Sequence, residues 1–220
     1  WISAYLMSKL NPQQFVGLLR SYGLNNPDIH PSMALALGPC ESSVCEMVSA
    51  YTAFANRGIR CAPLFVTKIE DNEGNVIATF QPRMNEVISE TSANKMLVEL
   101  QAVVNEGTAR RLRFKYNLKG EIGGKTGTTN RNADAWFMGF TPELVSGCWV
   151  GGEDRDIHFD SMSMGQGATM ALPIWAYFMQ KVFADPRLGY TQKATFDLPE
   201  GFDPCAKDDG GMNEYGIDEV

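Results

Sequence analysis

Residues 123–129, with the sequence GGKTGTT, combine a lysine and three threonines with closely spaced glycines. If this segment is a β-strand, the hydroxyls of Thr126 and Thr128 share one face, because alternate residues of a strand point to the same side. Gly127 between them would let a ligand lie against the bare backbone, and Lys125 would add a fixed positive charge. Such a site suits an extended, anionic ligand that carries a carboxylate.

The surroundings of this segment are basic, although the chain as a whole is acidic. Nineteen lysines and arginines stand against 26 aspartates and glutamates, which gives a net charge of −7 at pH 7. This balance argues against nucleic-acid binding through a basic surface. The basic residues near the segment either attract an anion or form a solvated loop before an edge strand, and both interpretations stay open. They are Arg110, Arg111, Arg113, Lys115, Lys119, Lys125 and Arg131.

Gly-Lys-Thr also ends the phosphate-binding P-loop motif, so nucleotide binding is an alternative to consider. That motif requires a glycine five residues before Gly124, and the residue at that position is Lys119. A P-loop must also open a helix, whereas residues 126–130 are β-branched residues, glycine and asparagine, which begin a helix poorly. We therefore interpret the segment as a strand that lines a site.

The chain offers few ligands for a metal ion. Its five cysteines form no C-x-x-C pair, and only His30 and His158 could complete a site. We predict no metal and no cofactor, and interpret the cysteines as small buried residues. The sequence leaves open whether one pair, such as Cys40 with Cys45, is oxidised.

The elements that must position residues 123–129 follow from the periodicity of the apolar residues. Helices are predicted where these residues recur at three and four positions. Asn11 and Pro12 separate the first two helices, since asparagine caps a helix and proline suits its first turn. The predicted helices are residues 1–10, 15–22, 43–56, 89–105 and 169–183.

Two groups of strands are expected between and after these helices. Residues 64–69 and 76–80 flank the loop sequence DNEGN at 71–75, which is typical of a hairpin. Three later segments should form adjacent antiparallel strands, because their connections are short. These segments are residues 121–129, 134–140 and 144–152. The last helix should pack on this sheet through Met170, Ile174, Tyr177 and Phe178.

This order of elements indicates an α+β fold with an antiparallel sheet flanked by helices. No linker divides residues 1–200, so we predict one domain there, and a loose acidic tail over residues 201–220. The longest apolar run, residues 170–179, is too short for a membrane helix. Because the chain starts at Trp1 without a methionine, we expect it to be a piece of a longer protein.

An ordered set of motifs resembles the class A penicillin-binding proteins, the bifunctional peptidoglycan synthases. Residues 125–130 (KTGTTN), 134–142 (DAWFMGFTP) and 149–151 (WVG) resemble the third active-site box of their transpeptidase domain and its surroundings. Four further stretches occur in the family's order, and the match extends to about residue 183. They are residues 46–58, 63–77, 103–109 and 165–179.

The resemblance implies the penicillin-binding protein and serine β-lactamase-like fold, and D,D-transpeptidase activity. In the family, a serine is acylated by a peptidoglycan stem peptide ending in D-Ala-D-Ala, and the amine of a second stem then forms the cross-link. β-Lactams mimic the D-Ala-D-Ala end. Lys125 and Thr128 are implied as catalytic: Lys125 in the proton network, Thr128 through an oxyanion-binding N–H. Substrate binding is implied for Thr126, Gly127, Thr128 and Thr129.

The family's nucleophile box, S-x-x-K, and its S-x-N box are not expected among these residues. Ser92-Ala93-Asn94-Lys95 fits both patterns, but a single helix cannot supply two boxes that approach from different elements. We expect both boxes, a glycosyltransferase half and a membrane anchor upstream of Trp1, with the parent protein at the periplasmic face of the inner membrane. The fragment alone is then expected to be inactive and to self-associate through apolar surface.

Two other interpretations share these motifs. One is a monofunctional relative: a D,D-carboxypeptidase, a β-lactamase or a β-lactam sensor. Residues 134–142 and 173–179 resemble those proteins less. The other is a non-catalytic peptidoglycan-binding domain that has kept the cleft and lost the nucleophile.

Overall fold

The computed structural model describes residues 2–206, so the predictions for Trp1 and for residues 207–220 of the tail lie outside the described part. The chain begins with helices, as expected. Asn11 caps the second of them, since its side-chain oxygen accepts hydrogen bonds from two backbone N–H groups of the first turn. These elements are α1 (Ile2–Ser8), α2 (Pro12–Ser21), the 3₁₀ turn η1 (Met33–Leu37) and α3 (Val44–Ala55).

The centre of the molecule is a three-stranded antiparallel sheet, and its strand order is β5-β6-β7. The strands are β5 (Gly123–Thr128), β6 (Asp134–Phe140) and β7 (Val145–Gly151). In the register of the sheet, Gly127 lies opposite Trp136, which in turn lies opposite Trp149. The predicted arrangement of three adjacent strands is confirmed, with β5 starting two residues later than expected.

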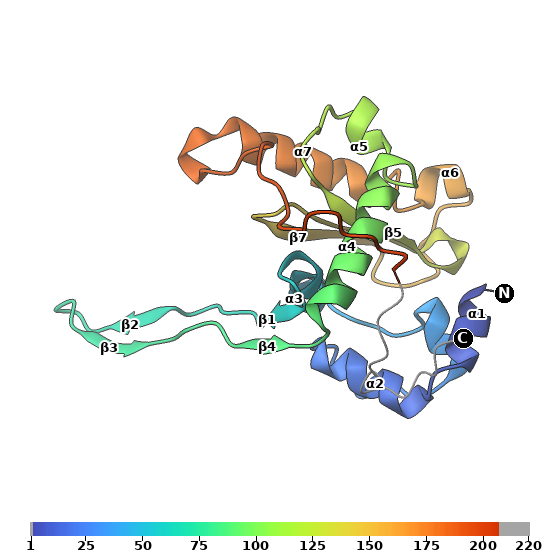
Figure 1. Cartoon of the computed structure of the whole chain (residues 1–220), viewed down its shortest axis with the longest axis horizontal. Coiled ribbons are helices and arrows are strands. Elements are labelled where there is room, and N and C mark those ends of the chain that lie inside the picture. Colours follow the sequence, from blue (N-terminus) through green and yellow to red (C-terminus); the bar gives the residue numbers. More distant parts are fainter. Residues whose placement is uncertain (1, 207–220) are drawn as a thin grey trace.

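Helices cover both faces of this sheet (Figure 1). On one face lies α7 (Ala171–Ala184), whose Trp175 ring meets the Phe137 ring edge-on at 5.2 Å between centroids. On the other face lie α3 and α4 (Glu90–Asn105), where Leu97 and Leu100 of α4 pack against Phe140. The mixture of helices and antiparallel strands confirms the α+β prediction. Two short helices complete the set: α5 (Arg111–Phe114) and α6 (Met162–Gly165).

Helix α7 forms where it was predicted, but the predicted contact side was wrong for three of its four residues; Met170 does pack against the core beside the sheet. Ile174, Tyr177 and Phe178 are between 46% and 57% exposed. The residues buried against the sheet are Ala171, Leu172, Trp175, Ala176, Met179 and Val182. Because this helix is apolar around almost its whole circumference, the sequence carries no polar stripe that marks the outer side. Small alanines on the inner side let the helix approach the strands closely.

The predicted hairpin is present, and it forms the outer part of a longer projecting arm, residues 59–86 (Figure 1). Its strands, β2 (Lys68–Glu70) and β3 (Val76–Thr79), are shorter than expected, and residues 64–67 are irregular. A second pair, β1 (Ile59–Cys61) with β4 (Met84–Glu86), joins the arm to the body and was not predicted. Pro63 and Pro82 stand between the two pairs and lack the N–H that a continuous ladder needs.

The contact between α3 and the sheet predicts that the stability of the folded protein decreases at alkaline pH. Tyr51 lies between Phe54 and Phe140, and desolvation there raises the pKa of its phenol to about 12. The unfolded chain ionises Tyr51 near pH 10, so the folded state loses stability as the pH rises above about 10. The loss approaches about 2–3 kcal/mol by pH 12. Tyr51→Phe should remove this contribution.

The measurement is urea unfolding of both proteins between pH 8 and about pH 11.5. The other tyrosines contribute equally to both, so the difference in unfolding free energy isolates Tyr51. A difference that stays constant over this range would contradict the prediction.

Candidate active site

The candidate site lies on β5, which is an edge strand of the central sheet. The Thr129 N–H donates to the carbonyl of Asp134 at 3.0 Å, so the backbone of Thr129 faces β6. In an antiparallel ladder, neighbouring residues face opposite ways, and the N–H of Thr128 therefore points out of the open edge. The Thr126 carbonyl also points outward, where it accepts a hydrogen bond from Lys125 Nζ at 2.9 Å.

The threonine hydroxyls lie on one face, as the alternation predicts. The register places Thr126 opposite Phe137, on the face that α7 covers, and Thr128 follows two residues later. Thr126 Oγ1 lies 2.8 Å from Thr108 Oγ1, and Thr128 Oγ1 accepts a hydrogen bond from the Gly167 N–H at 3.0 Å. Both hydroxyls are therefore held in place by segments far away in the sequence.

Thr108 and Gly167 contact the site, and the sequence analysis did not predict a role for either of them there. They belong to the stretches 103–109 and 165–179, whose motifs supported the resemblance without a role for either residue. A Cβ atom at position 167 would lie 2.4 Å from the carbonyl oxygens of Gly127 and Trp136. Only glycine therefore lets this segment lie so close to β5 and β6.

Thr129, the last of the predicted binding residues, bonds within the turn after β5. Its hydroxyl donates to Asp134 Oδ2 at 3.0 Å and accepts from the Asp134 N–H at 2.9 Å. The other carboxylate oxygen of Asp134 accepts from Trp149 Nε1 at 3.0 Å. Asp134 thus ties the turn to the farthest strand of the sheet. The Thr129 hydroxyl is thus bonded within this turn. Substrate binding by Thr129 stays a prediction.

Two arginines of the predicted basic cluster bind the backbone. Arg111 donates to the carbonyl of Ala168, at the entry to α7. Arg113 donates to the carbonyls of Leu118 and Gly120 and to the side chain of Asn105, and desolvation lowers the pKa of its guanidinium. These two residues hold the connection between α4 and β5, a role that neither of the two interpretations anticipated.

Both polar residues of the Ser92–Lys95 motif that matter for the pattern make hydrogen bonds within the fold. Ser92 lies in the first turn of α4, where its N–H and its hydroxyl both bond Ser89 Oγ, the capping group of the helix. Lys95 Nζ donates to the carbonyl of Ala206. That this motif is a coincidence stays a prediction.

Metal and disulfide chemistry find no support within residues 2–206. No group of three histidine, cysteine, aspartate or glutamate side chains in this range is placed to hold a metal ion. All five cysteines are free, Cys40 and Cys45 among them. The interpretation of the cysteines as buried residues was wrong, because three are partly exposed and Cys45 and Cys205 are exposed.

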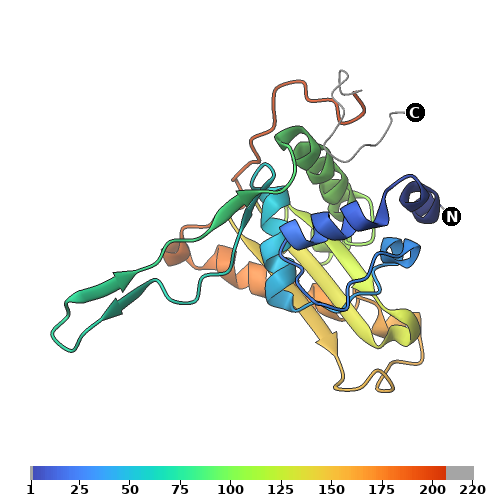
Figure 2. The ribbon, with the colours of Figure 1, turned by 90° about the horizontal axis from the view of Figure 1, so that it is seen from below.

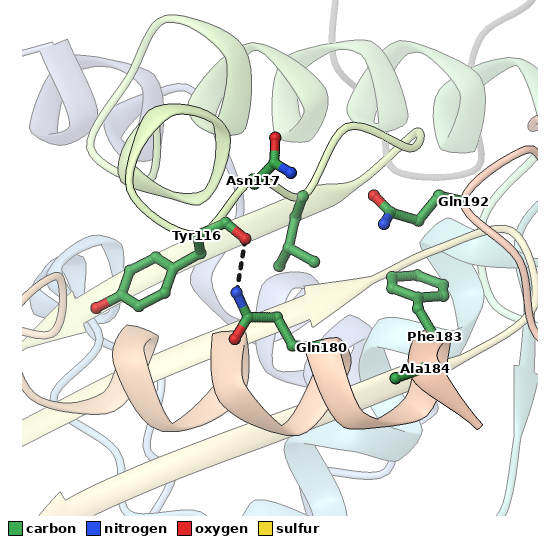
Figure 3. A pocket seen from close by; sticks show the side chains of 7 residues that line it. Tyr116, Asn117, Gln180, Phe183, Ala184 and Gln192 are labelled. Carbon is green, nitrogen blue, oxygen red and sulfur yellow. Dashed lines mark hydrogen bonds between the residues drawn. The ribbon is translucent and has the colours of Figure 1, made fainter.

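A pocket of about 270 Å³ lies apart from β5, between the end of α7 and the segment that follows α5 (Figure 3). The Gln180 side-chain amide crosses it and donates to the carbonyl of Tyr116 at 2.7 Å. The other lining residues are Asn117, Leu118, Phe183, Ala184 and Gln192. None of them is charged or belongs to β5, so this pocket is separate from the candidate site.

The fold and the Lys-Thr-Gly edge strand define the class of protein. The family described as "Penicillin binding protein transpeptidase domain" matches residues 10–146, and the chain belongs to this family. Among individual proteins, it is similar to penicillin-binding protein 1A of Aquifex aeolicus (38% identity over 177 residues) and of Neisseria meningitidis serogroup A (35% over 198 residues). These alignments cover 80% and 86% of the chain but 23% of each relative.

Solved structures agree with this assignment. Penicillin-binding protein 1A from Haemophilus influenzae superposes with a TM-score of 0.71 at 26% identity, over 82% of this chain and 31% of the other. PonA1 from Mycobacterium tuberculosis gives 0.72 at 26% identity, over 89% and 56%. The predicted fold class is therefore confirmed.

The hydrogen bonds of Asp134 predict that its side chain stabilises the turn between β5 and β6. Asp134→Ala removes the acceptor of the Thr129 hydroxyl and of the Trp149 indole, and should lower the free energy of unfolding by roughly 1–3 kcal/mol. Asp160→Ala, at an exposed loop position, is the control and should change it by less than about 0.5 kcal/mol. Chemical denaturation followed by circular dichroism measures both. Equal stabilities of the two variants would show that Asp134 does not hold the turn.

Proposed function

We propose that this chain forms the part of a peptidoglycan D,D-transpeptidase domain that carries the third active-site box. The observation that carries the proposal is the placement of the Lys-Thr-Gly sequence on an open edge strand, with the Thr128 N–H directed outward. Membership of the transpeptidase family supports it. The chain spans about a quarter of the curated relatives it matches, so the activity of the whole protein is part of the proposal.

In the proposed reaction, a stem peptide ending in D-Ala-D-Ala lies along the open edge of β5. Its terminal carboxylate accepts hydrogen bonds from the Thr126 and Thr128 hydroxyls, and Lys125 provides a compensating positive charge. A serine outside this chain attacks the carbonyl carbon of the penultimate residue, and the Thr128 N–H donates to the oxyanion. The terminal D-Ala leaves, and the amine of a second stem then displaces the serine and completes the cross-link.

Thr108 and Gly167 serve as positioning residues in this proposal. Thr108 orients the Thr126 hydroxyl, and the Gly167 N–H occupies one lone pair of Thr128 Oγ1. The Thr128 hydroxyl hydrogen is then free to point to an anion. With Thr108 as the donor of the bond between the two threonines, the site meets the carboxylate with donors that are already aligned, which reduces the ordering cost of binding.

β-Lactams and stem peptides are the proposed ligands, and nucleic acid is not. A solved relative, PonA1 at 25% identity, is in complex with penicillin V. We further propose that the parent protein acts at the periplasmic face of the inner membrane, held by an anchor upstream of this chain. Across residues 2–206, no helix has the length and apolar character needed to cross a bilayer.

The chain alone should not be acylated by penicillin. Its only S-x-x-K sequence is Ser92–Lys95, whose serine is hydrogen-bonded to Ser89, the N-cap of α4. The folded chain is incubated with a fluorescent penicillin and then separated by denaturing electrophoresis. We expect no label on the chain, and none on the matched Ser92→Ala variant. If the chain were labelled and the Ser92→Ala variant were not, Ser92 would be the nucleophile and the motif would not be a coincidence.

The carboxylate role of β5 is tested in the longer transpeptidase that contains this chain. Thr126→Val and Thr128→Val keep the shape and the β-propensity but remove a charge-assisted hydrogen bond. Each should reduce the rate of penicillin acylation roughly ten- to a hundredfold, since such bonds are worth about 1.5–3 kcal/mol. Lys125→Ala should reduce it further.

The control is Thr79→Val, an exposed strand threonine on the arm, which should leave acylation unchanged. Thermal melts of all the variants separate a loss of folding from a loss of binding. If Thr128→Val acylated at the original rate, β5 would not line the site and the proposal would fail. Unchanged acylation in all variants would favour a chain that binds peptidoglycan without taking part in catalysis.

A further inference from the structure

The projecting arm carries an open sheet edge far from the proposed site. β2 and β3 form a sheet of two strands, and no third strand joins them within residues 2–206. Both views show this arm extending away from the body (Figures 1 and 2). Apolar side chains on it are exposed: Phe65, Val66, Ile69, Val76, Ile77 and Met84. An isolated two-stranded ribbon is marginally stable in water, and an open edge is a template for another strand.

Of the two edges, the one on β2 is the better suited to pairing. Ile69 lies opposite Ala78 and Glu70 opposite Val76, so Ile77 is an extra residue that bulges from β3. A bulge bends its strand and disrupts regular pairing, whereas β2 contains no extra residue.

The backbone of β2 fixes which groups its open edge presents. The carbonyl of Thr67 accepts from the Phe80 N–H, and the Asp71 N–H donates to Asn75, so both residues face β3. By alternation, the N–H and C=O groups of Lys68 and Glu70 face outward. These two residues are therefore the ones that a further strand would bond.

The sequence of β2 is complementary to itself in the antiparallel direction. When a second copy of β2 is placed antiparallel with Ile69 on the two-fold axis, Lys68 of each copy lies opposite Glu70 of the other. Both residues present outward backbone groups, so each facing pair can exchange two N–H···O=C bonds. Ile69 then meets its own copy at the closely spaced position, and its side chain is 44% exposed in the single chain.

We propose that the arm pairs with a second copy of this chain through the β2 edge, in this register. The charges support that partner: Lys68 Nζ and Glu70 Oε1 lie 2.7 Å apart within one chain, and both side chains are about half exposed. In the pair, four alternating charges lie on the face opposite to the Ile69 side chains, and every charge has an oppositely charged neighbour on the other copy. The interface is isologous, so it closes after two chains.

The test uses charge reversal on the 220-residue chain, with the dimer dissociation constant measured by sedimentation equilibrium. Lys68→Glu and Glu70→Lys each turn two attractive cross-strand pairs into two repulsive ones and should weaken dimerisation at least tenfold. An equimolar mixture of the two variants should dimerise again, because one chain then has two acidic side chains and the other two basic ones. The double variant, with both changes in one chain, should also restore the dimer.

Lys181→Glu, on the exposed side of α7, makes the same change in net charge as Lys68→Glu and should leave the dissociation constant unaltered. Circular dichroism confirms that all the variants are folded. A chain that stays monomeric at submillimolar concentration would overturn the proposal. So would a dimer that both reversals leave intact, which would place the interface elsewhere, or single variants that fail to pair when mixed.

Discussion

The contact between the Trp175 and Phe137 rings sets the distance between α7 and the central sheet, and the candidate site depends on that distance. The rings can meet because position 139 has no side chain: a Cβ atom there would lie 2.6 Å from Trp175. The segment that leads into α7 is thereby brought down onto β5 and β6, where Gly167 reaches Thr128. Two glycines and one pair of rings thus determine where a hydroxyl of the edge strand is held.

Much of this architecture can be predicted from local sequence. The strands β5, β6 and β7 follow from alternation and from the short Thr-Pro-Glu turn, and the cap at Asn11 marks the start of α2. The contact side of α7 cannot be predicted this way, because the sequence of that helix is apolar nearly all around. The β1–β4 pair was also missed, since strands of three residues carry no detectable period and form only because the hairpin brings them together.

The candidate site can likewise be predicted from the sequence only in part. The shared face of Thr126 and Thr128 is a consequence of strand geometry, and the sequence is sufficient to predict it. The groups that hold these hydroxyls come from residues 18 and 39 positions away, and no local pattern points to them. Asp134 could be read as a turn residue, but its bond to Trp149 depends on the register of β6 with β7. What the sequence lacks at this site is information about tertiary contacts.

Two of the three tryptophans at the sheet, Trp149 and Trp175, have contrasting surroundings. Trp175 is 2% exposed, and its Nε1–H has no hydrogen-bond partner in the part of the chain that the structure describes. Trp149 is 41% exposed, and its Nε1–H is bonded to the carboxylate of Asp134. Indole emission shifts to shorter wavelength in apolar surroundings, so Trp175 contributes a blue component from the α7 layer and Trp149 contributes a red component from the sheet surface. Loosening of the α7 layer would therefore move the Trp175 contribution to longer wavelength, whereas a change at the turn beside β5 would alter the contribution of Trp149.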